Sequence, residues 1–263
     1  MSRSALRALA IATGVLLCTH SLYAFTEVTE SLAPCVVYLM QDVKVGEQAS
    51  IGSGFLLSAD NTTFLVTASH VAQALGQDLW LVMPDANGRA IKARMSNIKW
   101  VESSVADVAV TPVRPIDPGQ RKDLLCRSLP AHLLSARPLP PSRDIPLTVM
   151  GYPLGLGATG YVSPLSLETK AASGFITLPR FDNNKLSTFI LLQNPAIGGL
   201  SGGPVFDTGK MYFTGERMTV VRSGVSVVGL IHGVISDKTG GKFAAVVPAT
   251  EILKLVPGTE AKK

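Results

Sequence analysis

The chain has 263 residues, of which 46% are hydrophobic and 16% are charged. This length is sufficient for one large all-β unit or for two smaller domains with their own cores. The net charge of +5 is mild and the basic residues form no cluster, so a nucleic-acid-binding protein is not expected.

The N-terminus is predicted to be a secretory signal peptide, residues 1–24. Arg3 and Arg7 precede the apolar run "ALAIATGVLLC" (8–18), and the small residue Ala24 closes the segment. The run is too short for a membrane-spanning helix, although an uncleaved signal anchor is an alternative. No later stretch has 18 uninterrupted apolar residues, so the mature chain is expected to be soluble, in the periplasm or outside the cell.

Two cysteines remain after cleavage. Cys18 leaves with the signal peptide, and a lipoprotein is not predicted because Leu17 precedes it where a small residue is expected. Cys35 and Cys126 stay in the mature chain. In an oxidising compartment we expect a disulfide between them, and the alternative is two buried free thiols.

The pattern after residue 33 is typical of short β-strands separated by turns. Expected strands are 35–40, 53–58, 63–69, 78–83, 107–113, 147–152, 187–192, 226–234 and 243–248. Helical patterns are limited to "VAQALG" after His70 and "ATEILKLV" (249–256). Short strands at this spacing favour an all-β sandwich or barrel.

A proline-rich segment divides the chain. "RSLPAHLLSARPLPPSRDIP" (127–146) holds five prolines and no strand alternation, so it is interpreted as an ordered crossing between two β-units. The predicted organisation is therefore a β-unit at 25–126, the crossing at 127–146, a second β-unit at 147–250, and a C-terminal helix and tail at 251–263.

Three histidines are candidates for a general base, because His20 is lost with the signal peptide. His132 lies in the proline-rich crossing, and a surface position is expected. His70 ends "FLVTASHVA", where a buried strand runs into a small-residue turn and a short helix. A residue there is held rigidly and can face a cleft, although a structural histidine fits the same pattern.

Ser201 lies in "AIGGLSGGPVF" (196–206), where glycines surround one hydroxyl. If Ser201 attacks a carbonyl, the N–H groups of Gly199 and Ser201 are placed to bind the oxyanion, and Gly202 and Gly203 leave room for a substrate chain. The alternative is a glycine-rich hairpin.

Asp107 begins the alternating strand "DVAVTPV". An acid at the start of an apolar strand is able to accept a hydrogen bond from an imidazole and fix its tautomer. The alternative is an ordinary carboxylate at a strand start.

The motif "GLSGG" formally fits the nucleophile elbow of α/β-hydrolases, G-x-S-x-G. That fold needs alternating helices and the order Ser, acid, His. After Ser201 the chain offers only Asp207 and His232 in that order, and the helices are missing. The α/β-hydrolase interpretation is therefore rejected.

"VTASHV", "ADVAV" and "GLSGGPV", in this order, resemble the chymotrypsin-like (trypsin-fold) serine proteases, especially the bacterial HtrA-like type. Their candidate residues are 37 and 94 positions apart. "GSGFLLS", "GYPLGLG" and "FAAVVPATEIL" extend the similarity over about 45–256. The resemblance implies two six-stranded antiparallel β-barrels with the active site in the cleft between them. It assigns His70 and Asp107 to the first barrel, and Ser201 with its oxyanion donors to the second.

The chain departs from the family pattern at Leu200, where an Asp or Asn usually precedes the serine. Neither that acid nor an "IVGG"-like start occurs, so activation by a newly freed N-terminus is not expected. The absent polar side chain raises the question of what braces the oxyanion loop. No PDZ domain is expected after the protease unit, so regulation of the HtrA type is not assumed.

Specificity rests on "VVGLIHGV" (227–234), which is similar to the strand that pairs with the substrate backbone in this fold. His232 resembles the histidine of the "GIH" stretch in staphylococcal glutamyl endopeptidases and viral cysteine proteases, where it helps to recognise Glu or Gln. Gly229 on the same strand and Pro195 near the pocket base are the other candidate substrate-binding residues. Because Pro195 is not acidic, a preference for Lys or Arg is not expected. The alternative for His232 is a partly buried histidine bonded to a carbonyl.

The sequence thus predicts an exported serine endopeptidase that acts on protein or peptide substrates. No metal or cofactor is implied, since the Cys and His spacings match no ligand pattern. Two alternatives stay open: a non-catalytic binding module on the same fold, and an esterase or acyltransferase that uses the same triad.

Overall fold

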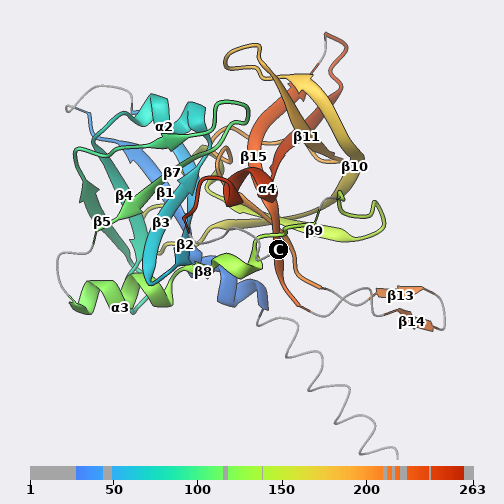
Figure 1. The fold of residues 1–263 in the computed structure, drawn as a ribbon. Coiled ribbons are helices and arrows are strands. Elements are labelled where there is room, and N and C mark those ends of the chain that lie inside the picture. The colour runs from blue at the N-terminus through green and yellow to red at the C-terminus, as the bar shows by residue number, and fades with distance from the viewer. Residues whose placement is uncertain are drawn as a thin grey trace, which may run out of the picture.

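The computed structural model describes residues 28–43, 49–114, 118–137, 139–209, 212–214, 217–219, 224–236 and 238–257. The predicted signal peptide, 1–24, lies outside these residues. The described chain begins with a helical turn (28–32) and then forms two antiparallel β-units that stand side by side (Figure 1). No helix within these ranges combines the length and hydropathy that a membrane span requires.

The first unit is an eight-stranded sheet in the order β5-β4-β1-β2-β3-β7-β6, with β8 paired to β2. Its strands are β1 (Val36–Gln41), β2 (Ile51–Ala59), β3 (Thr62–Thr67), β4 (Leu79–Pro84), β5 (Ala90–Met95), β6 (Val101–Glu102), β7 (Ala109–Val113) and β8 (Leu129–Pro130). The β2–β3 hairpin turns at Asp60 and Asn61, which both have positive φ. Asp and Asn tolerate this conformation, and two such residues form the type of turn that matches strand twist.

The second unit is a closed barrel in the order β10-β11-β16-β15-β12-β9. Its strands are β9 (Pro146–Gly151), β10 (Leu165–Pro179), β11 (Leu186–Leu192), β12 (Pro204–Asp207), β15 (Ser226–Ser236) and β16 (Lys242–Pro248). A separate two-stranded sheet pairs β13 (Tyr212–Thr214) with β14 (Arg217–Thr219). The predicted chymotrypsin-like double β-barrel fold is confirmed, with a closed six-stranded second barrel as predicted. The first unit, called the first barrel below, has eight strands instead of six, and two of them are only two residues long.

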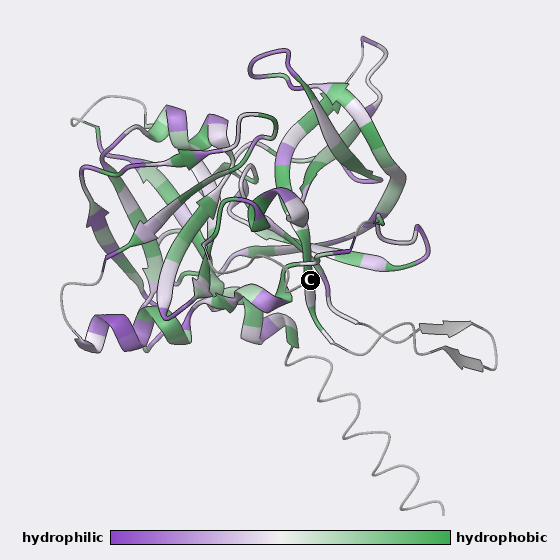
Figure 2. Cartoon of the chain, viewed as in Figure 1, coloured by the Kyte–Doolittle hydropathy of each residue, from purple (hydrophilic) through white to green (hydrophobic). Residues whose placement is uncertain are grey.

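Short helices occupy the connections. They are η1 (Ala33–Cys35), α2 (Ser69–Leu75), α3 (Pro118–Cys126), η2 (Ala131–Leu133), η3 (Pro153–Gly155) and α4 (Ala249–Leu253). Helix α3 runs along one end of the first unit, and Figure 2 shows that most of its ribbon has hydrophilic colours. The predicted crossing contains β8 and η2, and the two predicted helices correspond to α2 and α4.

The two units share one continuous core. Tyr152, which follows β9, is fully buried, and its hydroxyl donates to the carbonyl of Val36 on β1 at 3.2 Å. Its ring also packs edge-on against Tyr38 with a centroid distance of 5.7 Å. A second apolar cluster fills the interior of the second barrel and includes Leu200. Burial of apolar side chains on both sides of the boundary therefore fixes the facing edges of the two units, where the functional residues lie.

Candidate active site

His70 is the second residue of α2, directly after the buried strand β3. The residue before the helix, Ala68, has extended backbone angles and makes no side-chain cap. Instead, the main-chain N–H of His70 donates to Asp107 Oδ1 at 3.0 Å. Ser69 Oγ also donates to the carbonyl of Val108 at 2.8 Å. A side chain distant in sequence therefore satisfies an orphan N–H at the start of α2, which fixes the helix against the strand that follows Asp107.

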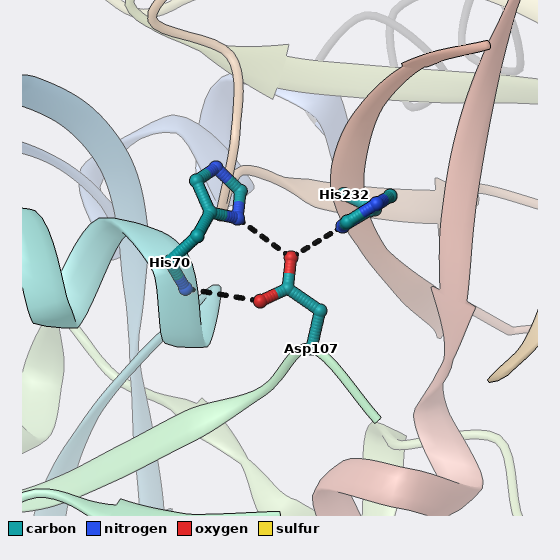
Figure 3. Close-up of side chains that lie close together, drawn as sticks. All are labelled: His70, Asp107 and His232. Carbon is teal, nitrogen blue, oxygen red and sulfur yellow. Dashed lines mark hydrogen bonds and ion pairs between the residues drawn. The ribbon is translucent and has the colours of Figure 1, made fainter. Parts of the chain in front are cut away.

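Asp107 accepts from the imidazole of His70 as well. The distance from His70 Nδ1 to Asp107 Oδ2 is 2.7 Å, and Asp107 is fully buried (Figure 3). Burial alone would raise the pKa of Asp107. The hydrogen bonds from His232 and His70, together with the charge that either imidazole carries when protonated, outweigh burial and hold that pKa well below its ordinary value. Asp107 is therefore an ionised, acceptor-only group at neutral pH.

Ser201 lies on the loop before β12, where the main chain passes very close to the first barrel. Gly202 has a φ of +83°, and a Cβ there would lie 2.1 Å from Thr67 Oγ1 and 2.2 Å from the carbonyl oxygen of Ser53. Only glycine fits that space and that conformation. Gly202 therefore brings the loop of Ser201 against β2 and β3, the strand that leads into His70. This favours the close-approach interpretation over the glycine-rich hairpin.

The hydroxyl of Ser201 donates to the main-chain carbonyl of His232 at 3.1 Å. Ser201 and His70 both lie in the described part of the chain, and no hydrogen bond joins the Ser201 hydroxyl to the His70 imidazole. In ligand-free enzymes the nucleophile–base hydrogen bond is often long or poorly aligned, so this geometry is compatible with a resting catalytic serine.

The predicted oxyanion donors lie on a loop that both barrels brace. Gly199 has a φ of +95°, and no described group accepts a hydrogen bond from its N–H or from that of Ser201. Ser53 Oγ, on β2, donates to the carbonyl of Gly199 at 2.7 Å and accepts from Tyr152 N–H at 2.8 Å. Two N–H groups are therefore available on a loop with fixed conformation, as an oxyanion site requires.

Leu200 provides a further brace for this loop. Its side chain is 1% exposed and packs into the core of the second barrel, beside Val149, Leu192 and Ile231. Its N–H donates to the carbonyl of Ile197 at 3.0 Å. Where the family pattern has a polar residue, this chain has an apolar anchor.

Two residues that the sequence reasoning missed complete the surroundings of Asp107. Arg180, immediately after β10, is 3% exposed, and its Nη2 lies 3.1 Å from Asp107 Oδ1. It also forms a bidentate pair with Asp182. Phe181 packs edge-on against His70, with the ring centroids 4.9 Å apart. The sequence offers no signal for either residue, because the burial of Arg180 and the exposure of Phe181 are visible only in the tertiary structure.

His232 lies on β15 and faces Asp107. Its Nδ1 is 2.5 Å from Asp107 Oδ2, and the residue is 0% exposed. The predicted role of His232 in recognising Glu or Gln therefore finds no support from its position, and that preference stays a prediction. Gly229 lies in the barrel wall, where a Cβ would meet the carbonyl of Val247 at 2.0 Å. Pro195 is exposed beside the small cavity under Leu200.

Two further residues of the sequence analysis lie away from this site. His132 is exposed on η2, as expected. The predicted disulfide is not formed: Cys35 is a buried free thiol and Cys126 is an exposed free thiol at the end of α3. Burial raises the pKa of Cys35 to about 11, so this thiol stays protonated at neutral pH.

His70, Asp107 and His232 bring three potential metal-ligand atoms within 4.8 Å of one another. These atoms already form hydrogen bonds between the residues, and the Arg180 guanidinium lies on the same carboxylate. The positive charge of Arg180 beside the Asp107 carboxylate opposes the binding of a metal cation at the same place. The arrangement therefore fits a hydrogen-bonded group of side chains rather than a metal site.

The fold of this chain is similar to that of solved structures of bacterial proteases. The Rv3671c protease of M. tuberculosis in its active form is 18% identical, with a TM-score of 0.55, and the match covers 90% of this chain and 85% of that one. An inactive serine-to-alanine mutant of Rv3671c is 19% identical, with a TM-score of 0.54 and coverages of 90% and 91%. A serine endoprotease of Yersinia pestis is 17% identical, with a TM-score of 0.54, and the match spans 88% of this chain and 64% of that one.

No curated protein sequence matches the chain. Residues 52–212, however, match the family described as "Trypsin-like peptidase domain", and this range includes the histidine, the aspartate and the serine discussed above. The match covers more than half of the chain. The chain therefore belongs to the trypsin-like peptidase family and is a serine-type endopeptidase.

Proposed function

We propose that this protein is an exported endopeptidase in which Ser201 is the nucleophile, His70 the general base and Asp107 the residue that orients His70. The observation that carries the proposal is the pair of hydrogen bonds from His70 to Asp107, one from the main chain and one from Nδ1. Since an ionised Asp107 only accepts, the proton of a neutral His70 sits on Nδ1. Nε2 is then free to take a proton from a nucleophile.

The first step is attack of Ser201 Oγ on the peptide carbonyl. Rotation about the Cα–Cβ bond moves Oγ from the His232 carbonyl towards His70, and His70 Nε2 takes its proton as the new C–O bond forms. The carbonyl oxygen becomes an oxyanion, for which the N–H groups of Gly199 and Ser201 are available. The ionised Asp107 stabilises the imidazolium.

The second step breaks the peptide bond. His70 gives its proton to the leaving amine, and an acyl-enzyme ester on Ser201 remains. Water then attacks this ester while His70 takes a proton from the water, and collapse of the second tetrahedral intermediate returns that proton to Ser201 Oγ. The products are a carboxylic acid and an amine, and the enzyme is regenerated.

Export is proposed from the sequence of residues 1–24 alone. The basic start, the short apolar run and Ala24 are the features that support it. N-terminal sequencing of the protein recovered from the culture medium or periplasm tests this part, with a start at Phe25 as the expected result.

The experiment that tests the catalytic proposal is labelling of the full chain by a fluorophosphonate probe, followed by mass spectrometry of the modified peptide. We expect one adduct, on Ser201, and its loss in Ser201→Ala and after heat unfolding. A folded protein that is not labelled contradicts the proposal and favours a binding module on the same fold. Turnover of acyl esters without cleavage in a peptide library contradicts the endopeptidase part and indicates an esterase.

A further inference from the structure

The carboxylate of Asp107 is held equally from the two barrels. From the first barrel, His70 supplies its main-chain N–H and its Nδ1. From the second barrel, Arg180 donates to Oδ1 and His232 donates to Oδ2. Each oxygen therefore has one donor from each unit, and Figure 3 shows Asp107 between the two imidazoles. A buried carboxylate with these donors has its orientation fixed by residues far apart in sequence.

His232 reaches Asp107 because it occupies a β-bulge. In the pairing of β15 with β16, Ile231 is opposite Val246 and Gly233 is opposite Ala245, so His232 has no partner of its own. A bulge bends the strand and redirects the side chain of the extra residue. The carbonyl of the neighbouring Ile231 accepts from Gly202 N–H at 2.8 Å. This hydrogen bond holds β15 against the loop that carries Ser201.

The same residue also contacts the nucleophile. The carbonyl of His232 accepts from Ser201 Oγ, and the imidazole of His232 bonds Asp107. Among the described residues, His232 is the one residue that bonds both the serine and the aspartate. The bulged residue His232 therefore connects Ser201 and Asp107, two members of the proposed triad.

The surroundings of the His232 ring determine which of its nitrogens donates to Asp107. The ring is packed between Phe181, at a centroid distance of 4.3 Å, and Phe189, at 4.9 Å. Its Nε2 is buried without a hydrogen-bond partner in the described part of the chain. An N–H in that position would lack an acceptor, so the proton is placed on Nδ1, where Asp107 accepts it.

The charges around Asp107 leave one net negative charge to face His70. Arg180 is shared between Asp107 and Asp182, so its positive charge is compensated by the second carboxylate. His232, as a neutral ring, adds a donor and no charge. The second barrel therefore holds Asp107 in place without removing the negative charge that stabilises a protonated His70.

We propose that His232 is a positioning residue, which fixes the Asp107–His70 pair through its imidazole and the resting rotamer of Ser201 through its carbonyl. This inference rests on the proposed function of Ser201. In this proposal His232 helps to assemble the site across the two barrels, and it does not recognise a substrate side chain. Substitution of His232 is expected to lower the rate of the chemical step and to leave the KM of peptide substrates nearly unchanged.

The test compares four variants in the full chain, with fluorophosphonate labelling of Ser201 as a substrate-independent measure of reactivity. His232→Leu removes the donor and keeps an apolar side chain between the phenylalanines, and we expect labelling to be about tenfold to a hundredfold slower. His232→Asn places an amide N–H near the position of Nδ1, whereas the longer amide of His232→Gln does not. We expect His232→Asn to react about tenfold faster than His232→Gln. His132→Leu, on the exposed histidine, is the matched control and should react like the wild type.

A second readout does not depend on activity. Proton NMR of the wild type with isotope-labelled histidine should show two low-field imidazole N–H resonances, from the His70 and His232 rings bonded to Asp107. His232→Leu should keep one of them, and His132→Leu should keep both. The folded state is checked by near-ultraviolet circular dichroism, and if His232→Leu does not fold, the Asn and Gln variants decide.

The outcomes separate the two proposals. A folded His232→Leu that labels at the wild-type rate, or that keeps both low-field resonances, overturns the positioning role. Equal rates for His232→Asn and His232→Gln do the same. Absence of labelling in the wild type contradicts instead the proposed function of Ser201, and the two resonances still decide where the His232 proton lies.

Discussion

Ser201 Oγ donates to the main-chain carbonyl of His232 at 3.1 Å, and the same His232 bonds Asp107 through its side chain. The serine therefore rests on the strand that also holds the aspartate. The proposed mechanism requires a side-chain rotation that turns Ser201 Oγ from this carbonyl towards His70. The proposed catalytic residues are thus held by β15 of the second barrel as well as by elements of the first.

Ser53 is expected to be essential for the oxyanion loop. Its hydroxyl donates to the Gly199 carbonyl and accepts from Tyr152 N–H. Ser53→Ala leaves both groups without this partner, which costs about 1–3 kcal/mol of unfolding free energy. It should also slow fluorophosphonate labelling, because Gly199 loses its brace. Urea unfolding and labelling rates measure the two effects.

The control for this prediction is Ser58→Ala on the same strand, whose hydroxyl makes one longer contact, 3.4 Å, to the Leu129 carbonyl. We expect it to label at the wild-type rate. Equal labelling of the Ser53 and Ser58 variants would show that the loop needs no support from β2.

Leu200 is expected to stabilise the same loop by apolar burial. Leu200→Ala removes most of a fully buried side chain and should cost about 2–5 kcal/mol of unfolding free energy. Labelling of Ser201 should slow as well, because the loop loses its anchor. Ile197→Ala, at a partly exposed position three residues earlier, is the matched control and should cost much less. If both variants lose equal stability, Leu200 is not a specific anchor.

The strand pattern and the proposed catalytic residues could be identified in the sequence because both depend on local features. Apolar alternation predicts β3 and β15, and the glycines around Ser201 indicate a close approach of the main chain. The longest strand, β10, was not predicted, since all but two of its residues are exposed or half-buried and they include Glu168, Lys170 and Gly174. Such a strand becomes recognisable only when its partners β9 and β11 are known.

The partners of Asp107 could not be predicted, for a different physical reason. Arg180 is 73 residues away in sequence, and its burial depends on how the β10–β11 connection folds over the first barrel. The direction of the His232 side chain depends on a one-residue bulge against β16, and a register shift leaves no mark in the strand pattern. The disulfide prediction failed similarly, because residue counts do not place Cys35 and Cys126 next to each other.

Arg180 is expected to be a major contributor to stability. Arg180→Met removes the buried cation and leaves the carboxylates of Asp107 and Asp182 without it, at a cost of about 3–5 kcal/mol. The double variant Arg180→Met with Asp182→Asn removes one of the two unpaired charges and should recover part of that loss. Urea unfolding of both proteins at neutral pH measures the difference.

Arg94→Met is the matched control for Arg180, because Arg94 is 56% exposed in its ion pair with Asp42, whereas Arg180 is 3% exposed. Exposed pairs contribute about 0–1 kcal/mol, so little loss is expected. A loss as large as that of Arg180→Met would show that burial of the pair is not the cause. Failure of the double variant to recover any stability would contradict the charge argument for Asp182.

The ionisation of Asp107 predicts how stability depends on pH. The pKa of Asp107 is lower in the folded protein than its unfolded value of about 3.9, so its ionised form stabilises the fold at every pH above about 4. This contribution is lost as the pH falls from about 4 towards the folded-state value. The difference in unfolding free energy between the wild type and Asp107→Asn should therefore be largest near pH 7 and shrink below pH 4. Urea unfolding of both proteins at pH 7, 5 and 3 measures it, and Asp144→Asn, at an exposed loop position, is the control. A difference that stays constant from pH 7 to 3 would mean that the folded structure does not favour the ionised carboxylate.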